Sequence, residues 1–186
     1  MKSASLFIGQ SIKNIVKIGS IFPSSSQLAR RVSRHIKGQV IIELGPGTGV
    51  FTREILKKIP SDGKLICIES NLSFADHLRE EIIDHRLQVI VGDALNLGEI
   101  LKNIGINKVD CVVSGLPIGN FTKRDKQKIL QEIYNCLNSG GVFIQFEYFL
   151  AAIKSIKKFF PRTDISYEIF NIPPAFVIEC QKDPAN

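Results

Sequence analysis

The fold is decided by residues 40–52, which read Val40-Ile41-Ile42-Glu43-Leu44-Gly45-Pro46-Gly47-Thr48-Gly49-Val50-Phe51-Thr52. The apolar, β-branched start is typical of a buried parallel strand, and the apolar spacing that follows Gly49 is typical of a helix. Between them lie three glycines, whose main chain can take a positive φ and come close to a ligand. The stretch therefore predicts a strand, a tight turn, and a helix whose first N–H groups face a ligand.

Length and composition indicate one ordinary globular domain. The chain has 186 residues, 44% of them hydrophobic and 23% charged. We expect a single domain over 1–186, with a helical cap over 1–36 and an α/β core over 37–186. The four cysteines lack the spacing of a metal site, so no metal is expected. Reduced thiols would suit a cytoplasmic protein.

The N-terminal segment is amphipathic and the whole chain is basic. No apolar run approaches the ~18 residues of a spanning helix, and a signal peptide is not expected. Over residues 4–18, Phe7, Ile8, Ile12 and Ile15 share one face of a helix, with lysines opposite. This helix fits both packing on the domain and lying in a membrane interface. The net charge of +6 fits a polyanionic partner, either anionic lipid or nucleic acid, and it equally fits a basic surface that is only solvated.

Segments typical of strands alternate with segments typical of helices along the rest of the chain. Strands are expected over 40–44, 64–69, 87–93, 109–114, 142–149, 165–170 and 175–180. Helices are expected over 27–36, from 50 onward, and over 72–82, 123–137 and 151–160. Asn71 is the expected cap of the third of these, and 138–141 the expected stop of the fourth. Such alternation predicts parallel βαβ units with right-handed crossovers.

Three acids stand at the carboxyl ends of predicted strands: Glu43, Glu69 and Asp93. Ligands of open α/β sheets bind beyond these ends. Glu69 is placed to accept both hydroxyls of a ribose. Asp93 is placed to accept from an adenine amino group, beside the N–H of Ala94. Each acid alone reads as a helix cap or a surface charge. Together with the glycine turn, they predict a bound adenosyl group.

The spacing from Glu43 to Gly49, Glu-x-Gly-x-Gly-x-Gly, resembles the first motif of class I S-adenosylmethionine-dependent methyltransferases. The resemblance implies a Rossmann-like α/β fold. We expect a mainly parallel seven-stranded sheet with helices on both faces and an antiparallel last strand, plus the N-terminal amphipathic helix. It also implies S-adenosyl-L-methionine as the cofactor.

The segment Ser114-Gly115-Leu116-Pro117-Ile118-Gly119-Asn120-Phe121 resembles the fourth motif of amino-methylating members, in which polar oxygens orient an amine. It departs from that motif in two ways. Gly115 stands where an acid or amide is usual, so Ser114 is the nearest polar side chain, and Ile118 replaces an aromatic residue. A flipped base stacks on such an aromatic residue, so its loss weighs against a nucleic-acid substrate. Phe121 is a possible substitute for it.

Four motifs together resemble bacterial phospholipid N-methyltransferases, which act on phosphatidylethanolamine and are related to ribosomal RNA adenine dimethyltransferases. They are 19–25, the glycine motif with Val50-Phe51-Thr52, 114–117, and Asn171-Ile172-Pro173-Pro174-Ala175. The resemblance implies that Phe22 to Ser25 close over the methyl donor. The cofactor-binding residues are then expected to be Phe22, Pro23, Ser24, Ser25, Glu43, Gly45, Gly47, Gly49, Glu69, Ser70, Asp93 and Ala94.

The same resemblance implies catalytic residues at Ser114, Gly115, Leu116 and Pro117, and substrate-binding residues at Asn120, Phe121 and Tyr148. Our leading hypothesis is methylation of the amine of phosphatidylethanolamine, with the Ser114 hydroxyl and carbonyls near Leu116 orienting the amine. No strong general base is evident. The enzyme would be cytoplasmic and peripherally bound to the inner face of the membrane through its N-terminal helix. The alternatives are an RNA adenine N6-methyltransferase, a cofactor-binding module without lipid activity, and a small-molecule amine methyltransferase.

Overall fold

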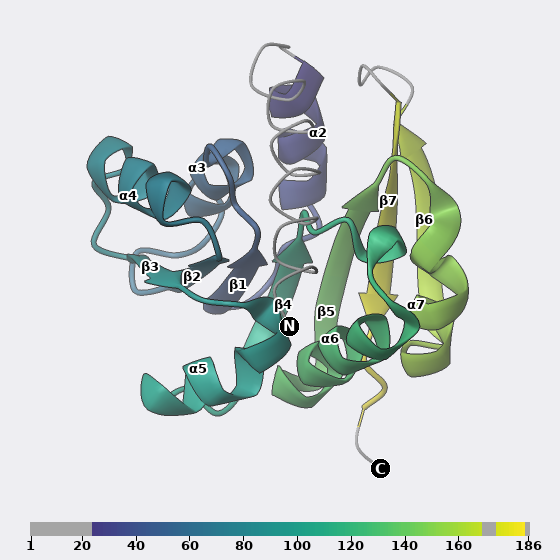
Figure 1. Cartoon of the computed structure of the whole chain (residues 1–186). Coiled ribbons are helices and arrows are strands. Elements are labelled where there is room, and N and C mark those ends of the chain that lie inside the picture. The colour runs from purple at the N-terminus through teal and green to yellow at the C-terminus, as the bar shows by residue number, and fades with distance from the viewer. Residues whose placement is uncertain (1–23, 169–173, 185–186) are drawn as a thin grey trace.

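The computed structural model describes residues 24–168 and 174–184, which form a seven-stranded sheet with helices on both faces (Figure 1). The strands are β1 (Val40–Leu44), β2 (Lys64–Glu69), β3 (Leu87–Val91), β4 (Val109–Ser114), β5 (Leu137–Glu147), β6 (Arg162–Glu168) and β7 (Ala175–Gln181). The helices are α2 (Ser24–Ser33), α3 (Val50–Leu56), α4 (Leu72–Glu81), α5 (Leu97–Asn103), α6 (Lys123–Cys136) and α7 (Ile153–Phe159).

The strand order is β3-β2-β1-β4-β5-β7-β6. The first five of these strands run parallel, while β7 runs antiparallel to both β5 and β6. This confirms the predicted Rossmann-like sheet. The chain leaves β1 toward β2 on one side and later returns to β4 on the other. The carboxyl ends of β1 and β4 therefore form the switch point where α/β folds bind their ligands.

Two apolar layers cover the sheet because its buried strands present apolar side chains to both faces. In β1, Ile42 and Leu44 face the layer built on α5, α6 and α7. Ile41 faces the layer built on α2, α3 and α4. A strand covered on both sides reads as a continuous apolar run, as Val40–Leu44 does apart from one acid. That acid is Glu43.

Local signals explain where most helices begin. The Asn71 side chain accepts hydrogen bonds from the N–H groups of Ser73 and Phe74, which confirms the predicted cap of α4. Thr122 caps α6 in the same way through the N–H of Asp125. Helix α5 was missing from the predicted helices, since only seven residues form it and Gly98 interrupts the pattern.

Several predicted boundaries were wrong. Helix α2 begins at Ser24 rather than at residue 27, and it ends at Ser33. Residues 138–141 do not form a stop after α6. They lie within β5, where the register to β4 shifts and Gly140 takes a φ of 73°. Strand β5 ends at Glu147 rather than at residue 149. Strand β6 begins at Arg162, three residues before the predicted start.

The predicted helix over 4–18 and the motif residues Phe22, Pro23 and 171–173 lie outside the described residues. The backbone of Ser24 and Ser25 forms the start of α2. Within the described part of the chain, no helix combines the length and the apolar character needed to cross a bilayer.

Candidate active site

The glycine turn that follows β1 has the backbone that its sequence predicts. Gly45, Gly47 and Gly49 have φ angles of 69°, 57° and 80°, in the left-handed region that favours glycine. A Cβ atom on Gly45 would lie 2.8 Å from Cδ2 of Leu116, so the turn also packs tightly against the segment after β4. Bare main chain at the switch point is the surface that a nucleotide-like ligand requires.

A cavity of about 170 Å³ lies beside this turn. Its walls come from the carboxyl ends of β1, β2, β3 and β4, and its lining residues are Gly45, Ile68, Glu69, Ser70, Asn71, Gly92, Asp93, Ala94, Leu116 and Phe121. The structure thus brings together five predicted cofactor residues: Gly45, Glu69, Ser70, Asp93 and Ala94.

Glu69 connects the glycine turn to the end of β2. Its side chain is buried, and its two carboxylate oxygens accept the N–H of Gly47 at 3.2 Å and the N–H of Asn71 at 2.9 Å. Burial raises the pKa of Glu69, and the N–H groups of Asn71 and Gly47 act against that rise. Ser70 donates to the same carboxylate through its N–H and its hydroxyl, so ribose hydroxyls would compete with these local donors for its about four acceptor positions.

Asp93 has a local partner as well as a place in the cavity. Its side chain accepts the N–H of Leu95 at 2.9 Å and so caps the short 3-10 helix Ala94–Asn96. The carboxylate is otherwise exposed at the rim of the cavity. The helix-cap reading and the ligand-binding reading of this acid are therefore compatible.

Glu43 differs from the other two acids in where its side chain points. It does not line the cavity; it points from β1 toward α3, where Oε2 accepts from Thr52 Oγ1 at 2.7 Å and from Cys67 Sγ at 3.3 Å. Burial raises the pKa of Glu43 to about 7, although these hydrogen bonds lower it. In the structure, Glu43 ties the start of α3 to β1 and β2, behind the glycine turn.

The predicted catalytic segment divides into buried and accessible parts. Ser114 is fully buried, and its hydroxyl accepts the N–H of Leu116 at 3.3 Å. The carbonyl of Leu116 accepts two hydrogen bonds, from Gln145 Nε2 at 2.8 Å and from the N–H of Ile118 at 2.7 Å. Protein donors thus occupy both acceptor positions of the Leu116 carbonyl and one of the Ser114 hydroxyl, and the expected role of these groups as acceptors for a substrate amine stays a prediction.

A second cavity, of about 470 Å³, opens on the other side of this segment. Its walls are largely apolar, and its lining residues are Gly115, Pro117, Gly119, Asn120, Phe146, Glu147, Tyr148, Phe149, Ala151 and Pro174. The predicted residues Asn120 and Tyr148 lie here, whereas Phe121 lines the first cavity. Residues 115–117 therefore separate a cavity suited to an adenosyl group from an apolar one.

Two buried polar residues of this region were not among the site residues predicted from the sequence. Glu147 is 7% exposed and lines the apolar cavity, and the fully buried Gln145 supports Leu116. The criterion that found Glu69 and Asp93, an acid at the carboxyl end of a strand, also describes Glu147. It was overlooked because the fifth strand was predicted to run to residue 149.

Known proteins resemble this chain in sequence. Residues 41–141 match the model of a methyltransferase domain family. The ornithine lipid N-methyltransferase of Singulisphaera acidiphila is 33% identical over 186 residues, which cover 97% of this chain and 97% of that enzyme. The chain belongs to the class I S-adenosylmethionine-dependent methyltransferases.

Solved structures show the same fold for this methyltransferase. An O-methyltransferase from Bacillus cereus in complex with S-adenosylhomocysteine has a TM-score of 0.68 at 14% identity, covering 93% of this chain and 91% of that one. The O-methyltransferase TomG from Streptomyces achromogenes, in complex with S-adenosylmethionine, has a TM-score of 0.66 at 16% identity, covering 87% and 81%. At these identities the likeness shows the fold.

The cofactor of this methyltransferase is S-adenosyl-L-methionine, and the described residues fit it. The glycine turn leaves its main chain uncovered by side chains. At Gly45 a side chain would also overlap Leu116. Glu69 would offer its buried carboxylate to the ribose, and Asp93 would offer its exposed carboxylate to the adenine amino group. When bound, the cofactor supplies a methyl group on a positively charged sulfonium, whose sulfur leaves as a neutral thioether.

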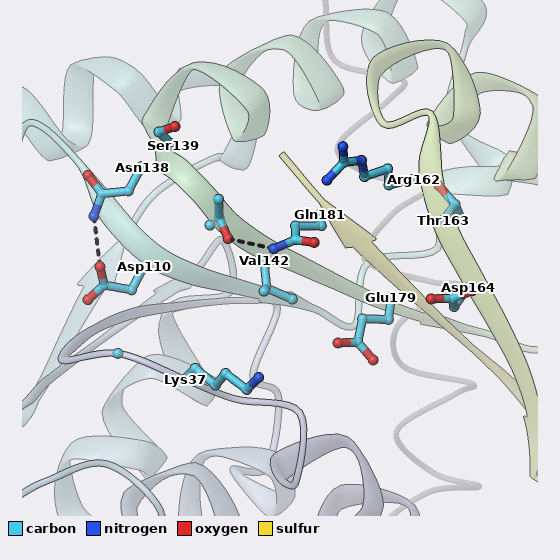
Figure 2. A pocket seen from close by; sticks show the side chains of 13 residues that line it. Lys37, Asp110, Asn138, Ser139, Val142, Arg162, Thr163, Asp164, Glu179 and Gln181 are labelled. Carbon is cyan, nitrogen blue, oxygen red and sulfur yellow. Dashed lines mark hydrogen bonds between the residues drawn. The ribbon is translucent and has the colours of Figure 1, made fainter. Parts of the chain in front are cut away.

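A further hollow, of about 670 Å³, lies at the opposite ends of the parallel strands (Figure 2). Cofactors of α/β folds bind at the carboxyl ends, not at these amino ends. Three of its charged side chains are already engaged. Asp110 accepts from Asn138, Glu179 lies 2.6 Å from His35, and Arg162 lies 3.2 Å from Asp183. We assign this hollow to the framework of the sheet rather than to the chemistry.

Proposed function

We propose that this methyltransferase methylates the primary amine of a membrane lipid, either phosphatidylethanolamine or an ornithine lipid. The observation that carries the proposal is the apolar cavity beside Gly115 and Pro117, next to the cofactor cavity. Both lipids carry a primary amine on a short stem attached to long acyl chains. A cavity with apolar walls suits such a stem, and the 115–117 segment lies where amine and methyl group have to meet.

The outer edge of this cavity supports approach from a bilayer. Phe149 lines the cavity with 79% of its surface exposed, and the neighbouring Leu150 is also exposed. Adjacent exposed apolar side chains that continue an apolar pocket form the kind of contiguous patch that marks an interaction surface. A bilayer interface would cover it.

Basic side chains follow directly in the sequence. Helix α7 exposes Lys154, Lys157 and Lys158. Each such residue near an anionic membrane contributes about 1 kcal/mol of attraction. This supports the expected peripheral binding to the membrane, to which the predicted N-terminal helix over 4–18 would add.

The RNA alternative depended on an exposed aromatic residue, Phe121, at the mouth of the pocket. Phe121 is half-buried, packs against the apolar layer of α5 and α6, and lines the cofactor cavity. It is therefore poorly placed to stack on a flipped base.

Transfer of a labelled methyl group to vesicles tests the proposal. The purified protein is given labelled S-adenosylmethionine and vesicles that contain phosphatidylethanolamine, ornithine lipid, or only phosphatidylglycerol, which has no amine. Label in one or both amino lipids supports the proposal and identifies the substrate. Label in adenine of added RNA, with none in lipid, contradicts it.

A further inference from the structure

Glu147 is a buried acid at the carboxyl end of β5, and one of its two oxygens has no partner. Oε1 accepts the N–H of Gly119 at 2.9 Å. Oε2 is buried and has no hydrogen-bond partner within residues 24–168 and 174–184. A buried carboxylate oxygen without a hydrogen-bond donor costs free energy, so a ligand group that donates to it would gain binding free energy.

The position of Glu147 makes it available to a substrate. It lines the apolar cavity together with Gly115 and Pro117, the accessible part of the predicted catalytic segment. Within that segment, Ser114 Oγ already accepts the N–H of Leu116, and the carbonyl of Leu116 already accepts two donors. Glu147 Oε2 is thus a carboxylate oxygen without a partner among the described residues, in the wall of this cavity, which Asn120 and Tyr148 also line.

The surroundings of Glu147 are compatible with a cation. Burial raises the pKa of Glu147, while the backbone N–H groups of Gly119, Ala152 and Ile118 and the charge of Lys126 act against that rise. The positive charge of Lys126 lies near Glu147. Lys126 Nζ donates to the carbonyl of Gly119 at 3.1 Å rather than to the carboxylate. The carboxylate therefore keeps a position for an ammonium group.

We propose that Glu147 binds the ammonium group of the substrate through Oε2 and takes one proton from it. The N–H bond breaks, its electron pair stays on nitrogen as the lone pair that methylation requires, and the proton moves to Oε2. The proton later leaves to water, so the carboxylate is restored. This inference rests on the proposed function, because it takes the substrate to be an amine. It supplies the base that the sequence did not reveal.

An acid with a raised pKa suits this task, since it holds the transferred proton more firmly than an ordinary carboxylate. An amine in water at neutral pH is almost entirely protonated and cannot attack. An enzyme that binds the ammonium form and removes its proton uses the abundant species.

The decisive variant is Glu147→Gln, which keeps the shape of the side chain and loses its charge. Glu54→Gln is the matched control, because Glu54 is 8% exposed and pairs with Lys57 on α3, outside both cavities. We expect Glu147→Gln to lower kcat/KM for the amino lipid roughly 10²- to 10⁴-fold at pH 7. The loss should shrink as the pH rises toward the pKa of the amine, because the substrate then arrives neutral.

Calorimetry with S-adenosylhomocysteine should show the same cofactor affinity in wild type, Glu147→Gln and Glu54→Gln. A second measurement needs no turnover: binding of dodecylamine is compared with binding of dodecanol, which has the same chain without a charge. Wild type should prefer the amine by at least about tenfold, and Glu147→Gln should lose that preference.

The outcomes separate the two proposals. Wild type that methylates no lipid but prefers dodecylamine through Glu147 contradicts the lipid substrate and supports the amine site. Glu147→Gln with the activity and pH profile of wild type overturns the inference and leaves the proposed function standing. A loss equal at every pH, accompanied by loss of cofactor binding, would show a purely structural role and also overturn it.

Discussion

The amide nitrogen of Gly47 lies 3.2 Å from Oε2 of Glu69, so the turn after β1 and the acid that ends β2 are joined directly. The contact spans 22 residues of sequence and fixes two walls of the cofactor cavity relative to each other. The same carboxylate also accepts the N–H of Asn71, ahead of α4. Glu69 is therefore both a part of the binding surface and the group that shapes it.

Replacement of Glu69 by alanine should weaken cofactor binding more than it weakens the fold. Hydrogen bonds to a charged group contribute about 1.5–3 kcal/mol each, so we expect the Kd for S-adenosylhomocysteine to rise at least about tenfold. Isothermal titration calorimetry measures this directly. Glu80→Ala, an exposed acid on α4, is the control and should bind as wild type does. Equal affinity in Glu69→Ala would contradict the role of Glu69 in the site.

Glu43 should make the stability of the protein depend on pH. Its pKa rises from 4.5 to about 7 on burial, so the folded state binds the proton more tightly than the unfolded chain. Its contribution to the free energy of unfolding is therefore complete below pH 4.5 and is lost as the pH rises through 7. A rise of this size corresponds to about 3 kcal/mol.

Urea unfolding at pH 5 and pH 8 measures that change. Wild type should lose unfolding free energy between the two values, and Glu43→Gln should lose clearly less. The pKa values of Glu69 and Glu147 are also raised, so part of the decrease in unfolding free energy between pH 5 and pH 8 should remain in the variant. Glu54→Gln should behave as wild type. An unchanged slope in Glu43→Gln would show that Glu43 does not titrate in this range.

Asp110 should be important for stability without affecting the cofactor. Its Oδ1 accepts from Asn138 at 2.7 Å (Figure 2). Its Oδ2 accepts the N–H groups of Gln39 and Val40 at 2.8 and 3.0 Å. The starts of β1, β4 and β5 are thereby held together. Asp110→Ala should lower the unfolding free energy by about 2–4 kcal/mol.

The control for Asp110 is Asp164→Ala, an exposed acid of the same hollow, which should change stability little. Cofactor affinity, measured on the folded fraction, should be unchanged in both, because the hollow and the cofactor cavity lie at opposite ends of the strands. A stability of Asp110→Ala equal to that of wild type would contradict this role.

Phe149 should promote binding to membranes. Burial of its exposed ring in a bilayer interface would contribute a binding free energy of about 1.5–3 kcal/mol. Phe149→Ser should therefore weaken binding to anionic vesicles about 10- to 100-fold. Ile83→Ser is the matched control, since Ile83 is 94% exposed but follows α4, away from the apolar cavity. Vesicle sedimentation compares the two. Equal binding by both variants would exclude Phe149 from the membrane surface.

The parts of the fold that depend on local signals could be predicted from the sequence. The apolar run over 40–44 is a buried strand, the three glycines take positive φ angles, and Asn71 caps α4. The cofactor cavity followed from these, because the carboxyl ends of parallel strands meet at one edge of a sheet. Glu69 and Asp93 lie there as expected.

The parts that depend on tertiary packing could not be predicted. Side chains alternate between the two faces of the sheet along β1, and this sets the direction in which Glu43 points. On that face, Thr52 and Cys67 donate hydrogen bonds to its carboxylate. The polar side chain of Ser114 was predicted to be available to the substrate, but tertiary packing buries it completely. Glu147 seemed to lie within a strand, because only the structure shows that pairing of β5 ends at that residue.

The measurement that tests the account most directly is the transfer of a labelled methyl group to vesicles by wild type and by Glu147→Gln. The account predicts label on the nitrogen of phosphatidylethanolamine or ornithine lipid, none on phosphatidylglycerol, and a deficit in the variant that narrows as the pH rises. Absence of label from every amino lipid, under conditions where calorimetry shows the cofactor bound, would contradict it.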